Sequence, residues 1–187
     1  MLEGTATTRY EANPAPGDLA LLQDLVNTVS VGPGADLLGS TDSATTWLAS
    51  IGTGTGTGAN VDVDSLERLR RLRTALRRLL GDGPAEHHQP VDLALRLRLD
   101  DDGITVPHGG GDFIEAKVAV ALLEGRATGA LSRLKLCANP DCQVAFFDQS
   151  KNGAGKWHSS ARCGNAARVR AHRDRTISRT DTNSSTS

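Results

Sequence analysis

Residues 137–163 read CANPDCQVAFFDQSKNGAGKWHSSARC, and this stretch decides the fold of the carboxy-terminal part of the chain. It holds every cysteine of the sequence and one histidine in a C-x4-C-x15-H-x4-C pattern: Cys137, Cys142, His158 and Cys163. Three thiolates and one imidazole are an accepted ligand set for a closed, tetrahedral zinc site. An odd, clustered set of cysteines also suits a metal site in a reducing cytoplasm better than a disulfide framework. We therefore predict one structural Zn²⁺ at these four residues.

The residues between the ligands predict how the chain wraps the metal. Asn139-Pro140-Asp141 is typical of a turn and would fold into a knuckle between the first two cysteines. Residues 144–147 read as a strand, residues 156–158 as its returning partner, and Asn152-Gly153 as the reversal. Ser159 or Ser160 would cap a helix that carries Cys163 in or just after its first turn. This order predicts a treble-clef-like zinc finger.

Other interpretations of the cluster match the sequence less well. The simplest is a set of incidental thiols with a surface histidine, but four ligand residues rarely coincide with fitting turns in so short a segment. A catalytic zinc would need an open coordination position, and a redox relay would favour Cys-x-x-Cys, which the sequence lacks. Residues 1–130 contain no nucleophile elbow or cofactor fingerprint. We therefore expect no enzymatic activity, and a hydrolase is the weakest alternative.

The helix predicted over residues 160–175 is basic. Asn165, Arg168, His172 and Arg175 recur three or four residues apart, so they share one face. Arginine and asparagine match guanine and adenine edges, and arginine also binds phosphate. We predict contact with nucleic acid at these residues: Lys156, Arg162, Asn165, Arg168, Arg170, His172, Arg173 and Arg175. Because a basic patch alone specifies only an anionic partner, docking on an acidic protein surface is the alternative.

The remainder of the chain is acidic and rich in helical patterns. Residues 1–150 carry 13 Lys and Arg against 20 Asp and Glu, whereas residues 151–187 carry 8 against 2. Apolar spacing predicts helices from Asp18 to about Val29, from Thr41 or Asp42 through Leu48, from Asp64 to Leu80, and from Asp112 to about Gly125. The third of these would turn a solvated arginine face outward, although such a row could also bind phosphate: Arg68, Arg70, Arg71, Arg73, Arg77 and Arg78.

One segment has the period of a strand instead. Leucines alternate with other residues over Leu93–Leu99, which predicts a half-buried strand, and residues 104–106 would return beside it as a hairpin. The predicted fold class is therefore mainly α with a small antiparallel β-hairpin sheet (α+β), plus a C-terminal treble-clef-like zinc finger.

The patterns divide the chain into four parts. We predict a flexible N-terminus at residues 1–16, an α-rich domain at 17–130, the zinc finger with its basic helix at 131–175, and a disordered Ser/Thr-rich tail at 176–187. The α-rich domain would sense a small-molecule effector or mediate assembly. No apolar stretch approaches the roughly 20 residues of a membrane-spanning helix. The polar N-terminus is unlike a signal peptide, so we expect a cytoplasmic protein with no membrane partner.

Residues 137–173 resemble the bacterial CGNR zinc finger family. Further upstream, Asp24-Leu25-Val26-Asn27-Thr28 and the strand-like Leu93–Leu99 resemble the ABATE domain that usually precedes that finger. Members of this family are described as stress-linked transcription regulators with a DNA-binding finger. The resemblance therefore implies a zinc-containing, DNA-binding transcriptional regulator. A zinc-stabilised protein-interaction module without DNA binding is the alternative.

The sequence departs from the family pattern at two positions. The third ligand, usually a cysteine in W-C-S, is His158 in Trp157-His158-Ser159. Histidine also binds zinc, so we expect the site to survive, with weaker binding at low pH. The name-giving C-G-N-R reads Cys163-Gly164-Asn165-Ala166. The contact of the family arginine would then fall to Arg162 or Arg168.

Overall fold

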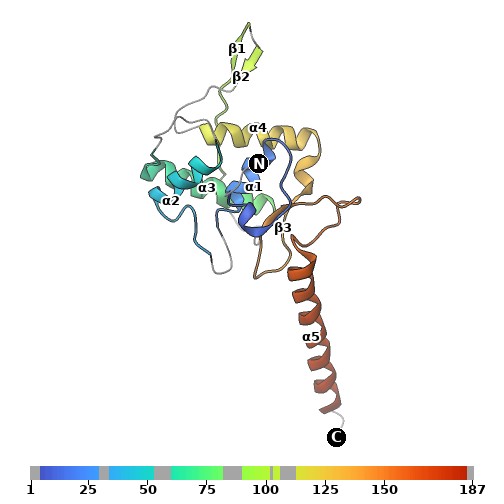
Figure 1. Ribbon diagram of the computed structural model, residues 1–187. Helices are drawn as coiled ribbons and strands as arrows, with labels where there is room; N and C mark the ends of the chain where they lie inside the picture. The colour runs from blue at the N-terminus through green and yellow to red at the C-terminus, as the bar shows by residue number, and fades with distance from the viewer. Residues whose placement is uncertain are drawn as a thin grey trace.

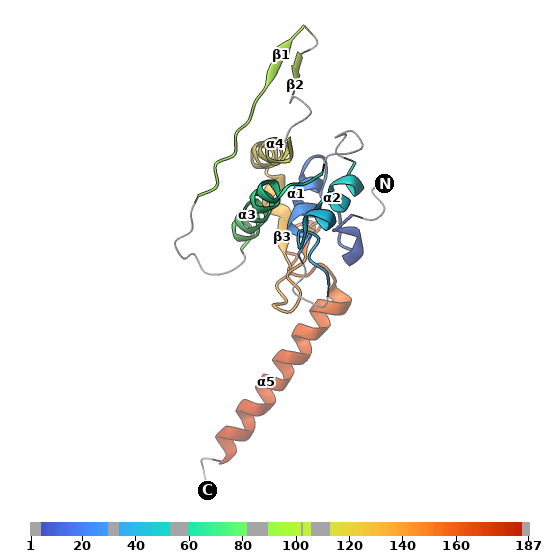
Figure 2. The ribbon, with the colours of Figure 1, turned by 90° about the vertical axis from the view of Figure 1, so that its left-hand side faces the viewer.

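The computed structural model describes residues 5–29, 34–52, 60–81, 90–101, 103–105 and 113–184. Figure 1 shows a helical body from which two elements project on opposite sides: the hairpin of strands β1 and β2, and the long helix α5. The view turned by 90° shows the same opposition (Figure 2). The predicted class, mainly α with small antiparallel sheets, is confirmed.

Helix α1 forms the centre of the body. The body helices are α1 (Leu19–Val26), α2 (Thr41–Ser50), α3 (Val63–Leu79) and α4 (Phe113–Ala127), and α1 packs against both α3 and α4. Leu22, Leu25 and Val26 are completely buried. The predicted leucine stripe of α3 is also buried from Leu66 to Leu76. Each such leucine contributes about 2 kcal/mol by leaving water, so these helices supply most of the core.

Two helices begin one or two residues before the predicted positions. The cap of α2 is Ser40 rather than Thr41 or Asp42, because Ser40 has the extended backbone of a cap and its Oγ accepts the amide of Ser43 at 3.2 Å. In α3 the cap is Asp62 rather than Asp64, and its Oδ1 accepts the amide three residues on at 2.7 Å. Runs of cap-forming residues are ambiguous in sequence, and only the backbone conformation selects one.

Helix α1 is shorter than predicted. Its first residue follows Asp18, whose side chain makes no capping hydrogen bond, and it ends at Val26 instead of about Val29. Thr28 leaves the helix because its Oγ1 donates to the carbonyl of Leu25 at 2.7 Å and its own carbonyl accepts the amide of Leu37 at 2.9 Å. Hydrogen bonding by Thr28 therefore ends the helix before its apolar pattern does.

Residues 5–16 are packed, which corrects the prediction of a flexible N-terminus for that part. They include a short 3-10 helix, η1 (Thr8–Tyr10). The buried carboxylate of Asp24 accepts the amides of Ala6 at 3.2 Å and Thr7 at 2.7 Å, and it also accepts the indole N–H of Trp47 at 2.8 Å. A buried carboxylate needs such donors. This requirement ties the N-terminal segment to α1.

The arginines of α3 do not form one solvated face. Arg71 and Arg78 are exposed, but Arg73 and Arg77 are buried. Arg73 pairs with Asp36 at 2.5 Å and donates to Thr28 Oγ1 at 3.1 Å. The prediction was wrong for these two arginines because the segment that follows α1 supplies acceptors to Arg73, and Gln143 of the finger supplies acceptors to Arg77.

The projecting hairpin is shorter and more exposed than predicted. Strand β1 (Arg98–Asp100) pairs antiparallel with β2 (Gly103–Thr105), so that Leu99 lies opposite Ile104. Residues 93–97 form no strand. Both Leu99 and Ile104 are exposed, by 78% and 70%. The half-buried strand predicted for Leu93–Leu99 is therefore wrong, because the described body does not extend beneath this hairpin.

The finger follows η2 (Ala130–Arg133). Strand β3 (Leu134–Leu136) pairs antiparallel with β4 (Ala145–Phe147), and the first two cysteines lie between these strands. The predicted strand at 144–147 is thus present in its main part, but its partner is β3 and not residues 156–158. Phe146 and Phe147 lie opposite Lys135 and Leu134, so the knuckle is the turn of the hairpin itself.

Helix α5 (Asn165–Ser184) ends later than predicted. It runs through residues 176–184, which the composition placed in a disordered tail, and residues 185–187 lie outside the described residues. No glycine or proline occurs after Gly164, so the sequence contains no strong terminator at Arg175.

The predicted boundary between body and finger crosses a continuous core. Leu134 of β3 and Ala145 of β4 belong to the same buried cluster as Leu22 and Leu25. No helix in the described part of the chain is long and apolar enough to cross a membrane.

Candidate metal centre

Each of the four predicted ligands comes from a different local structure. Cys137 follows β3, Cys142 ends the knuckle, and His158 ends the loop after β4. Cys163 lies in η3 (Ser160–Gly164), a π-helical turn that leads directly into α5. Their ligand atoms all lie within 4.8 Å of one another. The structure thus brings together the residues that the sequence predicts to bind metal.

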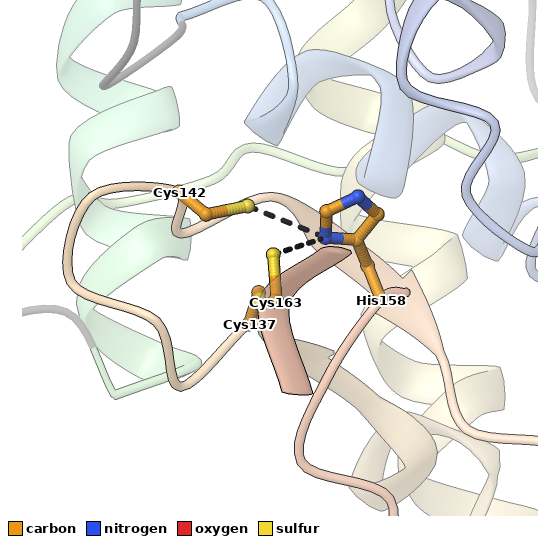
Figure 3. Close-up of side chains that lie close together, drawn as sticks. All are labelled: Cys137, Cys142, His158 and Cys163. Atoms are coloured by element: carbon orange, nitrogen blue, oxygen red, sulfur yellow. Dashed lines mark hydrogen bonds between the residues drawn. The ribbon is translucent and has the colours of Figure 1, made fainter. Parts of the chain in front are cut away.

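The spacing of these atoms fits a tetrahedral zinc site. His158 Nδ1 lies 3.3 Å from Cys142 Sγ and 3.6 Å from Cys163 Sγ, and Figure 3 shows both sulfurs directed at this nitrogen. Zinc bonds of about 2.3 Å to sulfur and about 2.1 Å to nitrogen would separate such atoms by roughly 3.5 Å in a tetrahedron. Cys137 and Cys163 are almost fully buried. The donors therefore form one closed site with Nδ1 as the histidine ligand, as expected of structural zinc.

Backbone amides of the knuckle support the sulfur ligands. The Cys137 amide donates to the carbonyl of Val144 at 2.9 Å and closes the hairpin across the turn, while the Cys142 amide donates to the carbonyl of Asn139 at 2.9 Å. The amides of Asn139 and His158 donate to the Cys137 sulfur, and the amide of Val144 donates to the Cys142 sulfur. Such hydrogen bonds stabilise thiolates and orient them toward a cation.

The three thiols differ in acidity. Hydrogen bonding from the Cys142 thiol, with backbone amides, lowers the pKa of Cys137 to about 3. The same interaction with Cys137, together with burial, raises the pKa of Cys142, and burial raises that of Cys163. Without a cation, the cluster favours one thiolate and two neutral thiols. A divalent ion must displace the two remaining protons, so metal binding should weaken as pH falls.

A partly buried ion pair between Lys135 and Asp148 holds the loop that delivers His158. Asp148 is 3% exposed and accepts Lys135 Nζ at 2.7 Å, the Ser150 amide at 3.0 Å and the Gly155 amide at 2.8 Å. Lys135 also donates to the carbonyls of Gly153 and Gly155. The hydrogen bonds from Lys135 and Ser150 lower the pKa of Asp148, so it stays ionised. The loop is thereby fixed on the β3–β4 hairpin.

Trp157 packs within the finger. A methyl group at Gly164 would lie 3.3 Å from Trp157 Cδ1 and 3.6 Å from a guanidinium nitrogen of Arg168. Gly164 therefore lets the indole lie against the turn that carries Cys163. Arg168 lies beside this contact, whereas Arg162 pairs with Glu11. Of the two candidates to replace the family arginine, Arg168 is the one that lies beside Trp157 and Gly164.

Sequence reasoning missed the residues that attach the finger to the body. Asn27 exchanges two hydrogen bonds with the backbone of Ala145, one accepted at 2.8 Å and one donated at 2.9 Å. Gln23 donates to the same carbonyl at 3.1 Å, and Arg77 donates to Gln143 Oε1, next to Cys142, at 3.2 Å. One feature of the sequence could have revealed these contacts: the polar residues Gln23 and Asn27 lie among and directly after the leucines of α1. Such residues are seldom buried without a specific partner.

The predicted nucleic-acid residues line the finger and α5, and all are exposed: Lys156, Arg162, Asn165, Arg168, Arg170, His172, Arg173 and Arg175. Two of them form ion pairs, Arg162 with Glu11 at 2.5 Å and Arg170 with Asp141 at 2.6 Å. Both pairs lie at the surface, where they contribute little to stability. The residues are thus gathered along one projecting element rather than in a pocket.

Comparison with known proteins supports the assignment of the finger. The CGNR zinc finger family matches residues 133–176. No curated protein gave a significant match to the chain. The matched segment runs from the residue before β3 into α5 and contains all four ligands. The match and the geometry agree on a C-terminal CGNR zinc finger with one Cys3His zinc site.

Proposed function

We propose that the finger binds DNA through α5 and that the chain acts as a transcriptional regulator in the cytoplasm of a bacterium. The observation that carries the proposal is the position of α5. It starts at the turn that holds Cys163 and extends away from the body (Figure 1). Its arginines from Arg168 to Arg175 are exposed. A helix of its length spans about 30 Å, and a single α-helix fits the major groove of B-DNA.

The charge of α5 also supports the proposal. Asn165, Arg168, His172 and Arg175 share a face. The acidic partners of Arg162 and Arg170 are exposed, so phosphates could replace them at little cost. Zinc anchors the first turn of the helix and would position these side chains relative to the finger.

The body would carry the regulatory part of this role. We propose that residues 17–130 are an ABATE-like domain that senses a small molecule or mediates assembly, without catalytic activity. The Asp24–Thr28 motif supports this assignment, since its residues connect the N-terminal segment, α2 and the finger to α1. A change in the body could reach the finger through these hydrogen bonds.

Fluorescence anisotropy with a labelled duplex DNA tests the proposal. We expect zinc-loaded protein to bind, with affinity falling steeply between about 50 and 200 mM salt as counterions are released. The double variant Arg168→Ala/Arg175→Ala should reduce the slope of log affinity against log salt by about 2, because each arginine–phosphate contact contributes about 0.9.

The matched control is Arg71→Ala/Arg78→Ala, which removes two exposed arginines from α3. We expect it to leave the salt slope unchanged. Equal losses in both variants, or an affinity that does not vary with salt, would contradict DNA binding by α5. Partners that persist on the protein after nuclease treatment of a lysate, and that are lost in the α5 variant, would instead support the protein-interaction alternative.

A further inference from the structure

The projecting hairpin exposes an apolar row that the described body leaves uncovered. Leu99 and Ile104 are cross-strand neighbours, exposed by 78% and 70%. Leu97, which precedes β1, is also exposed, by 54%. Exposed apolar side chains gathered on one projecting element indicate an interaction surface.

The hairpin is also too small to be stable by itself. Among the described residues, β1 and β2 form a two-stranded sheet of their own, with three residues in each strand. An isolated two-stranded hairpin is marginal in water and gains stability from further strands or from packing. The second edge of β1 pairs with no described strand and could accept one.

The sequence of β1 is complementary to itself in one antiparallel register. When β1 of a second copy runs antiparallel with Leu99 opposite Leu99, Arg98 of each copy lies opposite Asp100 of the other. Because the two copies are related by a twofold axis, the Arg98–Asp100 pair occurs twice, and both pairs lie on the same face of the sheet. On the other face, Leu99 and Ile104 of both copies join into one continuous apolar row. Pairing through β2 would align Gly103 with Thr105 and gain no ion pair.

We propose that two copies of the chain associate through the edge of β1 that faces away from β2, centred on Leu99, to form a four-stranded antiparallel sheet. The hairpin and α5 leave the body on opposite sides (Figures 1 and 2), so the association keeps both zinc fingers accessible. Because each strand has only three residues, we expect the interface to be smaller than the roughly 800 Å² per partner of a standard complex. We therefore expect a reversible dimer with a dissociation constant of about 1–100 μM. The inference does not rest on DNA binding.

Sedimentation velocity of the zinc-loaded chain over a range of concentrations tests the association. The wild type should shift from monomer to dimer. Arg98→Asp alone, or Asp100→Arg alone, places like charges opposite each other twice and should weaken association about tenfold or more. The double variant Arg98→Asp/Asp100→Arg restores complementary pairs and should recover the wild-type constant. Arg126→Asp, an exposed charge reversal on α4, is the control and should have no effect.

Cysteine cross-linking tests the register. Directly opposed residues in an antiparallel pair lie about 5.5 Å apart or less between Cα atoms, which is within disulfide range. Under mild oxidation, Leu99→Cys should therefore form a covalent dimer and Ile104→Cys should not. Circular dichroism should show that these variants keep the folded body, since the hairpin contributes little to its core.

The proposal is overturned if the wild type stays monomeric at every concentration. It is also overturned if the double charge exchange stays as weak as the single variants, or if Ile104→Cys cross-links in preference to Leu99→Cys.

Discussion

Helices α3 and α5 are both rich in arginine, yet they use it in opposite ways. In α3 a leucine stripe packs on α1, and two arginines, Arg73 and Arg77, are buried with acceptors from other segments. In α5 there is no such stripe, and its arginines up to Arg175 are exposed. In these two helices, the presence of an apolar stripe decides whether the arginines become part of a core. Without one, an anchor at the end of the helix must hold it in place.

The largest expected effect comes from removing that anchor. His158→Ala and Cys163→Ser should each lower bound zinc from one equivalent to none, as measured by metal analysis. Zinc supplies about 10 kcal/mol or more of folding free energy in comparable finger peptides. Residues 133–176 should therefore lose protection in hydrogen exchange, while α3 keeps more of its protection because leucines anchor it.

Lys156→Ala serves as the control for the zinc variants, since it changes an exposed residue between the ligands. It should retain one equivalent of zinc. Full zinc retention in both ligand variants would refute the ligand assignment.

A smaller effect is expected on the free energy of unfolding, which should distinguish an arginine of α3 from an arginine of α5. Arg73→Ala leaves Asp36 and Thr28 without their buried partner and should lower the free energy of unfolding by about 2–3 kcal/mol. Arg173→Ala on α5 should change it by less than about 0.5 kcal/mol. Denaturant unfolding of the zinc-loaded proteins measures both. Similar losses for the two variants would remove the distinction between the helices.

The smallest effect concerns the pH dependence of the Arg73 pair. Burial raises the pKa of Asp36, but hydrogen bonds from Arg73 and the Leu38 amide outweigh it and leave the pKa below its ordinary value of 3.8. A lowered carboxyl pKa stabilises the folded state above the unfolded pKa and loses that effect as pH falls through the folded pKa. The contribution should be below about 1 kcal/mol because Asp36 is partly exposed.

Comparison of wild type with Asp36→Asn tests this pair. Their difference in unfolding free energy should shrink from about pH 6 to about pH 3. In an Arg73→Ala background the difference should be small throughout. A difference that grows toward low pH would contradict the assigned direction.

The sequence predicted the metal centre better than it predicted the packing around it. Ligand type and spacing sufficed for Cys137, Cys142, His158 and Cys163, because zinc accepts few donor sets and the intervening turns are short. The partner of strand β4 was mispredicted because two segments, β3 before it and residues 156–158 after it, are both close enough in sequence to pair with it. The Lys135–Asp148 pair, which fixes the intervening loop, joins residues 13 positions apart and has no local signature.

Local sequence was sufficient to predict the approximate positions of the main helices, the zinc ligands and the basic character of the C-terminal helix. Each of these depends on periodicity or spacing within a few turns of chain. Contacts between distant segments, in contrast, explain why residues 5–16 are packed, why Arg73 and Arg77 are buried, and why Asn27 joins the body to the finger. These contacts form because polar groups that become buried require hydrogen-bond partners from distant parts of the chain. Which groups become buried is settled only when the chain folds.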